Sequence, residues 1–106
     1  MRITDLQAFL LVAETRSISG AARRAYLTQP AVSAIVAALE WETGAALLRR
    51  QARQRAPLEM TEAGVLFAEY AERMLALHRE MEARIRVRGE QGEDVTLSCG
   101  RSNSVN

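Results

Sequence analysis

Two short stretches separated by one tight turn constrain the fold of this chain more than any other feature. The first runs from Ser17 to Ala25 (SISGAARRA) and the second from Thr28 to Glu40 (TQPAVSAIVAALE). In the second stretch Thr28 can cap a helix, and Pro30 is tolerated in the first helical turn, where its missing N–H would have no partner. The apolar residues recur at helical spacing and predict one buried face: Val32, Ile35, Val36 and Leu39.

The opposite face of this predicted helix is small and polar. At about 100° per residue, Gln29 lies at the border of that face near the helix start. A face of this kind can approach the edge of a base pair closely, so the pair of stretches predicts a DNA-binding helix-turn-helix. The residues that point away from the predicted core are Pro30, Ser33, Ala34 and Ala37.

The chain around this motif predicts two further helices and a defined stop. Thr4 and Gln7 have the spacing of a capping box and precede a stripe of Leu6, Phe9, Leu10 and Ala13. Ser17 or Ser19 caps the second helix, and Tyr26 and Leu27 form the turn after it. The third helix runs from about Gln29 to Thr43, and Gly44 ends it in the left-handed conformation.

A basic segment follows the predicted third helix. Residues 49–56 (RRQARQRA) contain four arginines and no acid, and residues 57–60 alternate between apolar and polar. Pro57 cannot donate a hydrogen bond to a sheet, which places it at a strand start or edge. This pattern predicts a short β-hairpin, the wing of a winged helix, whose arginines contact DNA. A solvated arginine-rich loop is the alternative.

The next element is a long helix predicted over residues 61–88, with Thr61 as its cap. Its apolar residues alternate at spacings of three and four, as in the seam of a coiled coil. Such a helix cannot bury its stripe alone, so we expect a homodimer; folding back onto the chain's own winged domain is the alternative. The predicted dimer residues are Phe67, Tyr70, Met74, Leu77, Met81 and Ile85.

Composition narrows the classes of function. The net charge is +1, but residues 1–60 carry +3 and residues 61–106 carry −2, so the positive excess coincides with the motif. All 14 basic residues are arginine, which a coding bias explains equally well. No signal peptide or membrane span is evident, so the expected location is the cytoplasm. Cys99 has no partner for a disulfide, and no metal or cofactor motif occurs.

Together these segments resemble the N-terminal region of LysR-type transcriptional regulators. The resemblance covers roughly residues 3–88 and is carried by LQAFLLVAE, SISGAARRAYLTQPAVSAIVAALEWETG, LLRR and TEAG. It implies a mainly α, winged helix-turn-helix domain at residues 1–60 and a linker helix for dimerisation at residues 61–88. Residues 89–106 would be a hinge and the truncated start of an effector domain, with an alternating strand beginning at Val95.

The resemblance also implies partners and contacts. Family members bind interrupted inverted repeats in duplex DNA as dimers or tetramers, and sense a small molecule through a C-terminal domain that we expect to be absent here. Gln29, Pro30 and Ser33 would face the major groove, and Arg50, Arg53 and Arg55 would belong to the wing. The remaining residues that we expect at the DNA are Ser17, Ser19, Thr28, Ala34 and Ala37.

This chain departs from the family pattern in the third helix. Ala34, Ala37 and Ala38 stand where relatives often carry basic residues, so direct base contacts should be few. Trp41 stands where an acid is common, and we expect it to pack against the linker helix or the wing rather than to stack on a base.

Two other classes of function remain for comparison. His78 is the only histidine and lies on the predicted coiled-coil helix, and no nucleophile–base grouping or phosphate loop occurs, so an enzyme is not expected. The competing hypothesis is a dimeric helical module whose winged domain binds a protein instead of DNA. It predicts that the wing arginines can be neutralised without loss of the partner.

Overall fold

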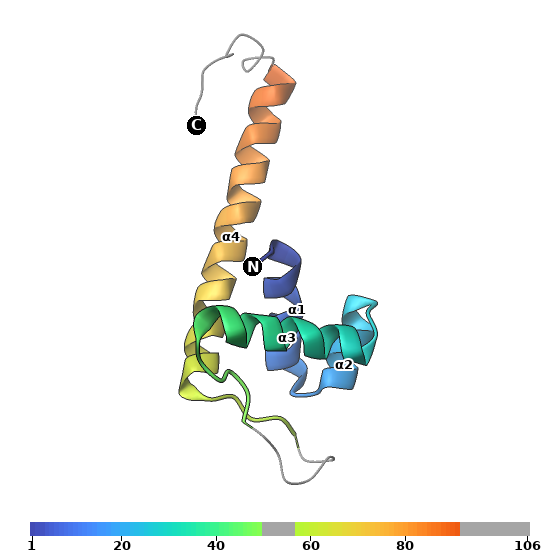
Figure 1. Ribbon diagram of the computed structural model, residues 1–106. Coiled ribbons are helices and arrows are strands. Elements are labelled where there is room, and N and C mark those ends of the chain that lie inside the picture. Colours follow the sequence, from blue (N-terminus) through green and yellow to red (C-terminus); the bar gives the residue numbers. More distant parts are fainter. Residues whose placement is uncertain (50–56, 92–106) are drawn as a thin grey trace. The chain divides into compact units, whose positions relative to one another are not determined.

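The computed structural model describes residues 1–49 and 57–91 (Figure 1). Residues 1–75 form one compact unit, and a second unit begins at Ala76. The prediction of a mainly α fold is confirmed, and all three predicted helices of the winged domain are present. The helices are α1 (Ile3–Thr15), α2 (Ile18–Ala25), α3 (Gln29–Thr43) and α4 (Glu62–Gln91).

Helix α1 begins differently from the prediction. The capping pair of Thr4 and Gln7 is wrong, because the helix starts at Ile3 and Thr4 already lies in its first turn. The carboxylate of Asp5 instead accepts a hydrogen bond from the N–H of Arg2, with 2.9 Å between Arg2 N and Asp5 Oδ2. An acidic side chain in the first turn also complements the positive end of the helix dipole.

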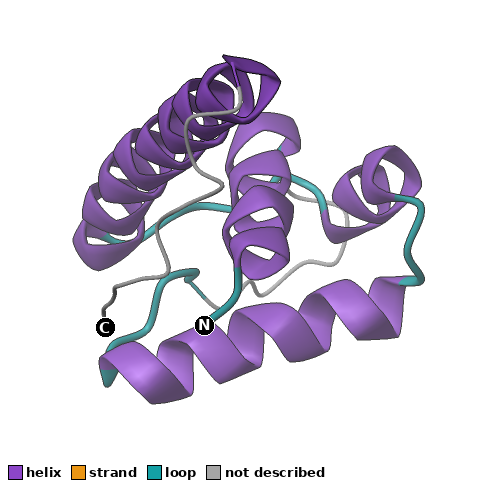
Figure 2. Ribbon diagram, turned by 90° about the horizontal axis from the view of Figure 1, so that it is seen from above, coloured by secondary structure: helices purple, strands orange, loops and turns teal. Residues whose placement is uncertain are grey.

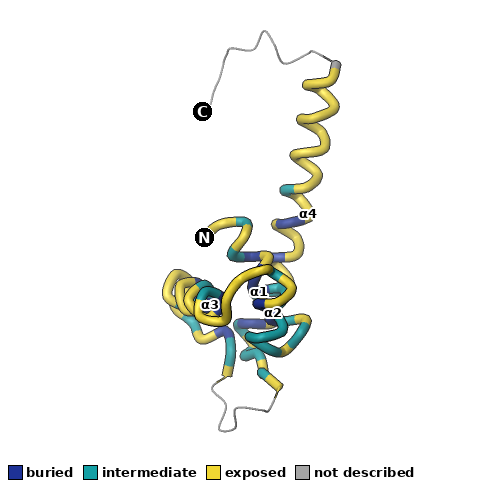
Figure 3. The backbone as a smooth tube through the Cα atoms, turned by 90° about the vertical axis from the view of Figure 1, so that its right-hand side faces the viewer, coloured by how far each residue is buried: buried dark blue, intermediate teal, exposed yellow. Residues whose placement is uncertain are grey.

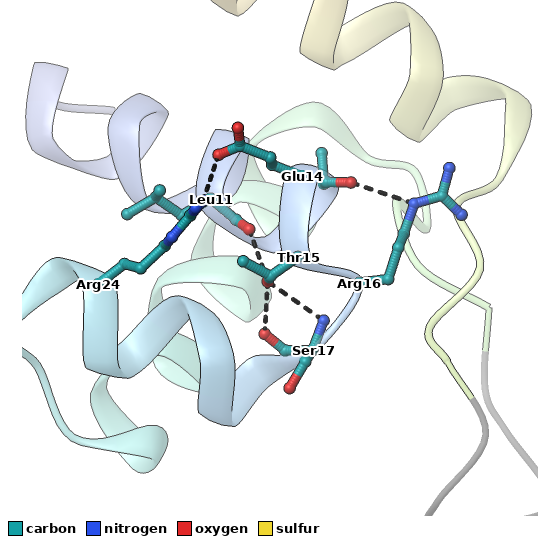
Figure 4. Close-up of polar contacts among 7 residues, drawn as sticks. Leu11, Glu14, Thr15, Arg16, Ser17 and Arg24 are labelled. Atoms are coloured by element: carbon teal, nitrogen blue, oxygen red, sulfur yellow. Dashed lines mark hydrogen bonds and ion pairs between the residues drawn. The ribbon is translucent and has the colours of Figure 1, made fainter.

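The junction between α1 and α2 is held by side-chain hydrogen bonds to the backbone (Figure 4). The hydroxyl of Thr15 lies 2.7 Å from the Leu11 carbonyl oxygen and accepts the N–H of Ser17. Ser17 then caps α2, because its Oγ accepts the N–H of Gly20 over 3.0 Å. An ion pair of 2.6 Å between Arg24 and Glu14 also joins the two helices. Of the two predicted caps, Ser17 and Ser19, the structure has Ser17.

The turn between α2 and α3 is as tight as predicted. Tyr26 adopts the left-handed conformation with φ 57°, and the N–H of Leu27 donates to the Ala22 carbonyl over 2.9 Å. Thr28 caps α3 by accepting the N–H of Ala31, and Gly44 ends the helix with φ 72°. Figure 2 shows α3 along one edge of the first unit, with α1 and α2 to one side of it.

The core of the first unit joins α1, α2, α3 and the first half of α4. Phe9 is fully buried and meets the ring of Phe67 edge to face, with 5.0 Å between ring centroids. A second cluster places Leu6 of α1 against Ala71 and Leu75 of α4. Phe67, Ala71 and Leu75 follow one another at intervals of four residues, so they lie on one face of α4, and that face packs into the core.

The base of the predicted wing lies within the described residues. Leu48 and Met60 form a single antiparallel bridge, and the N–H of Arg49 donates to the Glu59 carbonyl over 2.8 Å. The chain therefore returns beside itself as a hairpin requires, although a named strand is absent from the described residues. The tip, with the predicted contacts Arg50, Arg53 and Arg55, lies outside the described residues.

Helix α4 begins where the sequence predicts and ends later. Thr61 caps it by accepting the N–H of Gly64 over 2.9 Å, and its own hydroxyl donates to the Ala46 carbonyl. The helix continues through Gly89 to Gln91, three residues beyond the predicted end at Arg88. A glycine inside a helix costs only about 1 kcal/mol relative to alanine, so it need not end one. The predicted strand from Val95, and Cys99, lie outside the described residues.

Candidate nucleic-acid interface

Helix α3 has one buried and one open face. Of the four residues predicted to be buried, Val32, Val36 and Leu39 are buried, and Ile35 is half-buried and packs against the core. The residues of the other face are exposed, and Figure 3 shows the exposed turns along α3. The α3 residues predicted to contact DNA are all on this open side: Gln29, Pro30, Ser33, Ala34 and Ala37.

The N-terminal end of α3 is suited to a negatively charged partner. The first backbone N–H groups of a helix have no partner within it, and the helix dipole makes that end positive. The described helix has no acidic side chain in its first turn, and Thr28 satisfies the N–H of Ala31. Phosphate groups bind favourably at such helix ends.

The two predicted serine contacts lie at the start of α2. Ser17 and Ser19 are half-buried, and their hydroxyls lie 3.0 Å apart in a mutual hydrogen bond. Because Ser17 also caps α2, its hydroxyl is already used in the fold. The structure thus gives Ser17 a role in holding α2, whereas a DNA contact at either serine remains a prediction.

Sequence reasoning did not single out two residues that the structure places close to this interface. Arg23 is exposed in the last turn of α2, directly before the turn to α3. Glu40 is half-buried in α3, and its Oε2 accepts the N–H of Leu47 over 2.8 Å and that of Leu48 over 3.3 Å. Glu40 therefore ties the last turn of α3 to the base of the wing. Only the adjacent arginines could have indicated Arg23, and no local pattern indicates the partners of Glu40.

The prediction that Trp41 packs against the linker helix or the wing is wrong. Its side chain is 87% exposed, so it packs against neither the linker helix nor the wing within the described residues. The reason is its position around the helix: Trp41 follows Ala37 by four residues and Ala34 by seven, which places it on the open face. Its size suggested packing, but its phase on α3 decides the outcome.

The predicted dimer stripe on α4 divides into two parts. Phe67 packs against Phe9 in the core, which assigns it to the chain's own fold and agrees in part with the alternative that the helix folds back. Leu66, which the prediction omitted, is exposed one turn before Tyr70. The other predicted stripe residues are between 46% and 64% exposed: Tyr70, Met74, Leu77, Met81 and Ile85.

Two further classes of site are absent from residues 1–49 and 57–91. In those ranges no group of three His, Cys, Asp or Glu side chains is placed to hold a metal ion. The same described helices include none with the length and hydropathy needed to cross a bilayer.

The sequence of this chain is similar to those of known proteins. Residues 3–65 match the family described as bacterial regulatory helix-turn-helix protein, lysR family. The HTH-type transcriptional regulator TfdT of Cupriavidus pinatubonensis is 38% identical over 95 residues, which cover 88% of this chain and 40% of TfdT. The chain therefore spans less than half the length of this curated relative.

Solved structures of DNA complexes are also similar. The CbnR_DBD–DNA complex superposes with a TM-score of 0.77 at 35% identity, over 84% of this chain and 99% of that one. Vibrio fischeri DarR in complex with DNA, described as revealing the transcriptional activation mechanism of LTTR family members, gives a TM-score of 0.78 at 28% identity. That match covers 86% of this chain and 30% of DarR.

Proposed function

The chain belongs to the lysR family of bacterial regulatory helix-turn-helix proteins, and from this premise we propose that it binds duplex DNA sequence-specifically as part of a transcriptional regulator. The observation that carries the proposal is the open face of α3, which exposes the polar side chains of Gln29 and Ser33 among small residues, on a helix whose other face packs into the core. Relatives solved with DNA support it. The proposed role is non-catalytic and cytoplasmic.

In this proposal α3 lies with its N-terminal end in the major groove. Gln29 can make paired hydrogen bonds to adenine, and the Ser33 hydroxyl can serve either a base or a phosphate. The methyl groups of Ala34 and Ala37 offer apolar contact to thymine methyl groups, which makes base recognition sparse but selective. The wing arginines Arg50, Arg53 and Arg55 add contacts to phosphates or the minor groove.

We further propose that a homodimer presents two such helices to an inverted repeat. The exposed stripe of α4 supplies an apolar surface that a second copy would cover, and a two-fold dimer matches a two-fold operator. A tetramer and a small-molecule effector, which the family resemblance implies for longer members, remain proposals for the whole protein.

The experiment measures the affinity of the purified chain for labelled duplexes of varied sequence by fluorescence anisotropy. Gln29→Ala and Ser33→Ala should change the order of preferred sequences. Arg53→Gln should weaken binding to all sequences alike and reduce the slope of log affinity against log salt by about one. Arg79→Gln on α4 makes the same charge change outside the proposed interface and serves as the control.

Two results would contradict the proposal. If Gln29→Ala and Ser33→Ala leave the sequence preference unchanged, α3 is not the recognition helix. If Arg53→Gln and Arg79→Gln have the same small effect on affinity and salt dependence, the wing does not contact DNA, and the protein-interaction module becomes the better account.

A further inference from the structure

Trp41 is the one tryptophan of the chain, and its side chain is 87% exposed near the end of α3. An indole ring has a large apolar surface and a single N–H donor, so it gains most from a partner that offers both apolar contact and an acceptor. A deoxyribose-phosphate backbone offers these two groups side by side, the sugar carbons and the phosphate oxygens.

The position of Trp41 on α3 points its side chain the same way as the proposed recognition face. Trp41 follows Ala37, Ala34 and Pro30 by four, seven and eleven residues, so the four positions form one line along the helix. All of them are exposed. The alanines are too short to screen the indole, which therefore projects beyond the surface that they form.

The length of α3 decides which part of the duplex the indole reaches. Trp41 lies twelve residues after Gln29, or about 18 Å along the helix axis. The major groove of B-DNA is about 12 Å wide. With the Gln29 end among the bases and the helix axis running across the groove, about 18 Å of helix exceeds the groove width, so the Trp41 end would reach the sugar-phosphate backbone.

The backbone that carries Trp41 is fixed from both sides. Thr43 donates from its hydroxyl to the Leu39 carbonyl over 2.8 Å, and the N–H of Gly44 donates to the Glu40 carbonyl over 2.9 Å. The Glu40 side chain holds the amides of Leu47 and Leu48. The indole is thus presented from an ordered helix end, which limits the entropy lost on binding.

From these observations we propose that Trp41 is a further DNA-contacting residue, whose indole N–H donates to a phosphodiester oxygen flanking the half-site bound by α3. The inference rests on the proposed function, because it uses the placement of α3 in the major groove. It assigns to Trp41 a positioning contact, one that adds affinity without distinguishing one base sequence from another.

The first test uses the intrinsic fluorescence of Trp41 in the otherwise unmodified chain. Free protein should show the long-wavelength emission and ready acrylamide quenching of a solvated indole, at dilutions that span dimer formation. Binding a selected duplex should shift the emission to shorter wavelength and protect it from acrylamide. Emission that is unchanged when anisotropy shows bound duplex, or that is already protected in free dimers, would overturn the inference.

The second test separates this contact from the ionic ones. Trp41→Phe, which keeps a ring but removes the donor, should weaken binding about tenfold on preferred and non-preferred duplexes alike. The slope of log affinity against log salt should stay unchanged, because a neutral donor releases no counterion. Trp41→Ala should weaken DNA binding more than Trp41→Phe does. Val65→Ala, which shortens an exposed apolar residue of α4, should leave the affinity for DNA unchanged. Equal melting temperatures confirm that these variants fold.

A third measurement locates the acceptor. Each phosphate around the half-site is replaced in turn by a neutral methylphosphonate. At one position this replacement should weaken binding of the wild-type chain but leave the affinity of Trp41→Phe unchanged. If Trp41→Phe and the phosphate replacements change the affinity independently of each other at every position, the inference is overturned while the proposed function stands. A wild-type chain that binds no duplex would overturn both, so the two failures are distinguishable.

Discussion

At the scale of single residues, Gly64 has a stricter steric requirement than Gly20 or Gly44. It is buried in the first turn of α4, where an added methyl group would collide with the carbonyl oxygen of Leu47 and lie 3.0 Å from its carbonyl carbon. Backbone cannot move aside as a flexible side chain can. The close approach of α4 to the base of the wing therefore depends on the absence of a side chain at Gly64.

Substitution of this glycine has an expected cost and a matched control. Gly64→Ala should lower the free energy of unfolding by about 3 kcal/mol, since the added methyl group overpacks the contact. Gly20→Ala in α2 meets only contacts of 3.4 Å and should instead raise it by about 0.5–1 kcal/mol. Urea denaturation of both variants measures the difference. Equal effects of the two substitutions would contradict the packing described for Gly64.

Local chemistry explains which residues could be predicted from the sequence. The caps at Thr28 and Thr61 and the stop at Gly44 depend only on neighbours within four residues, and all three were predicted correctly. For α2 the sequence left Ser17 and Ser19 as alternative caps, and the structure has Ser17. Trp41 was predicted incorrectly, because its surroundings depend on which side of α3 meets another element. Likewise, the heptad position of Phe67 could not show that its ring meets that of Phe9.

At the scale of elements, Glu40 connects α3 to the base of the predicted wing. Its carboxylate accepts two backbone N–H groups that the chain leaves unpaired as it departs from α3, those of Leu47 and Leu48. Two contacts on one side chain fix the direction in which the wing begins. The orientation of the wing relative to α3 should therefore depend on this carboxylate.

Removing the Glu40 side chain tests that dependence. Glu40→Ala leaves two partly buried amides without their acceptor and should cost about 1–3 kcal/mol of stability. Hydrogen exchange at Leu47 and Leu48 should accelerate together. Glu42→Ala removes an exposed carboxylate, which pairs with the N-terminal ammonium over 3.0 Å, and should cost at most about 1 kcal/mol. Unchanged exchange in Glu40→Ala would contradict the connection.

The helices were predictable as elements, whereas the wing was only partly so. Apolar periodicity located all four helices, and capping residues marked the starts of α2, α3 and α4, because each signal is a pattern within the segment. The end of α4 at Gln91 was missed because Gly89 alone cannot end a helix. For the hairpin, the sequence predicted where the chain turns back, and the bridge between Leu48 and Met60 agrees with that prediction.

At the scale of the whole molecule, the exposed stripe of α4 is the surface that the proposed dimer would bury. Leu77→Glu should raise the dimer dissociation constant at least about tenfold, because a carboxylate would lose its hydration on burial. Val87 is similarly exposed on the same helix but two residues past Ile85, about 200° around the axis. Val87→Glu should leave association unchanged in sedimentation velocity. Similar behaviour of the two variants would show that this stripe is not the interface.

The central claim is that the open face of α3, which exposes Gln29 and Ser33 among small residues, gives sequence-specific binding to duplex DNA. The most direct measurement selects bound sequences from a random duplex library with the purified chain at near-physiological salt. The account predicts enrichment of an inverted repeat whose half-sites lie on one side of the duplex, and loss of that motif in Gln29→Ala. The account would be contradicted if the chain binds weakly and enriches no sequence, and if Gln29→Ala binds with the same affinity.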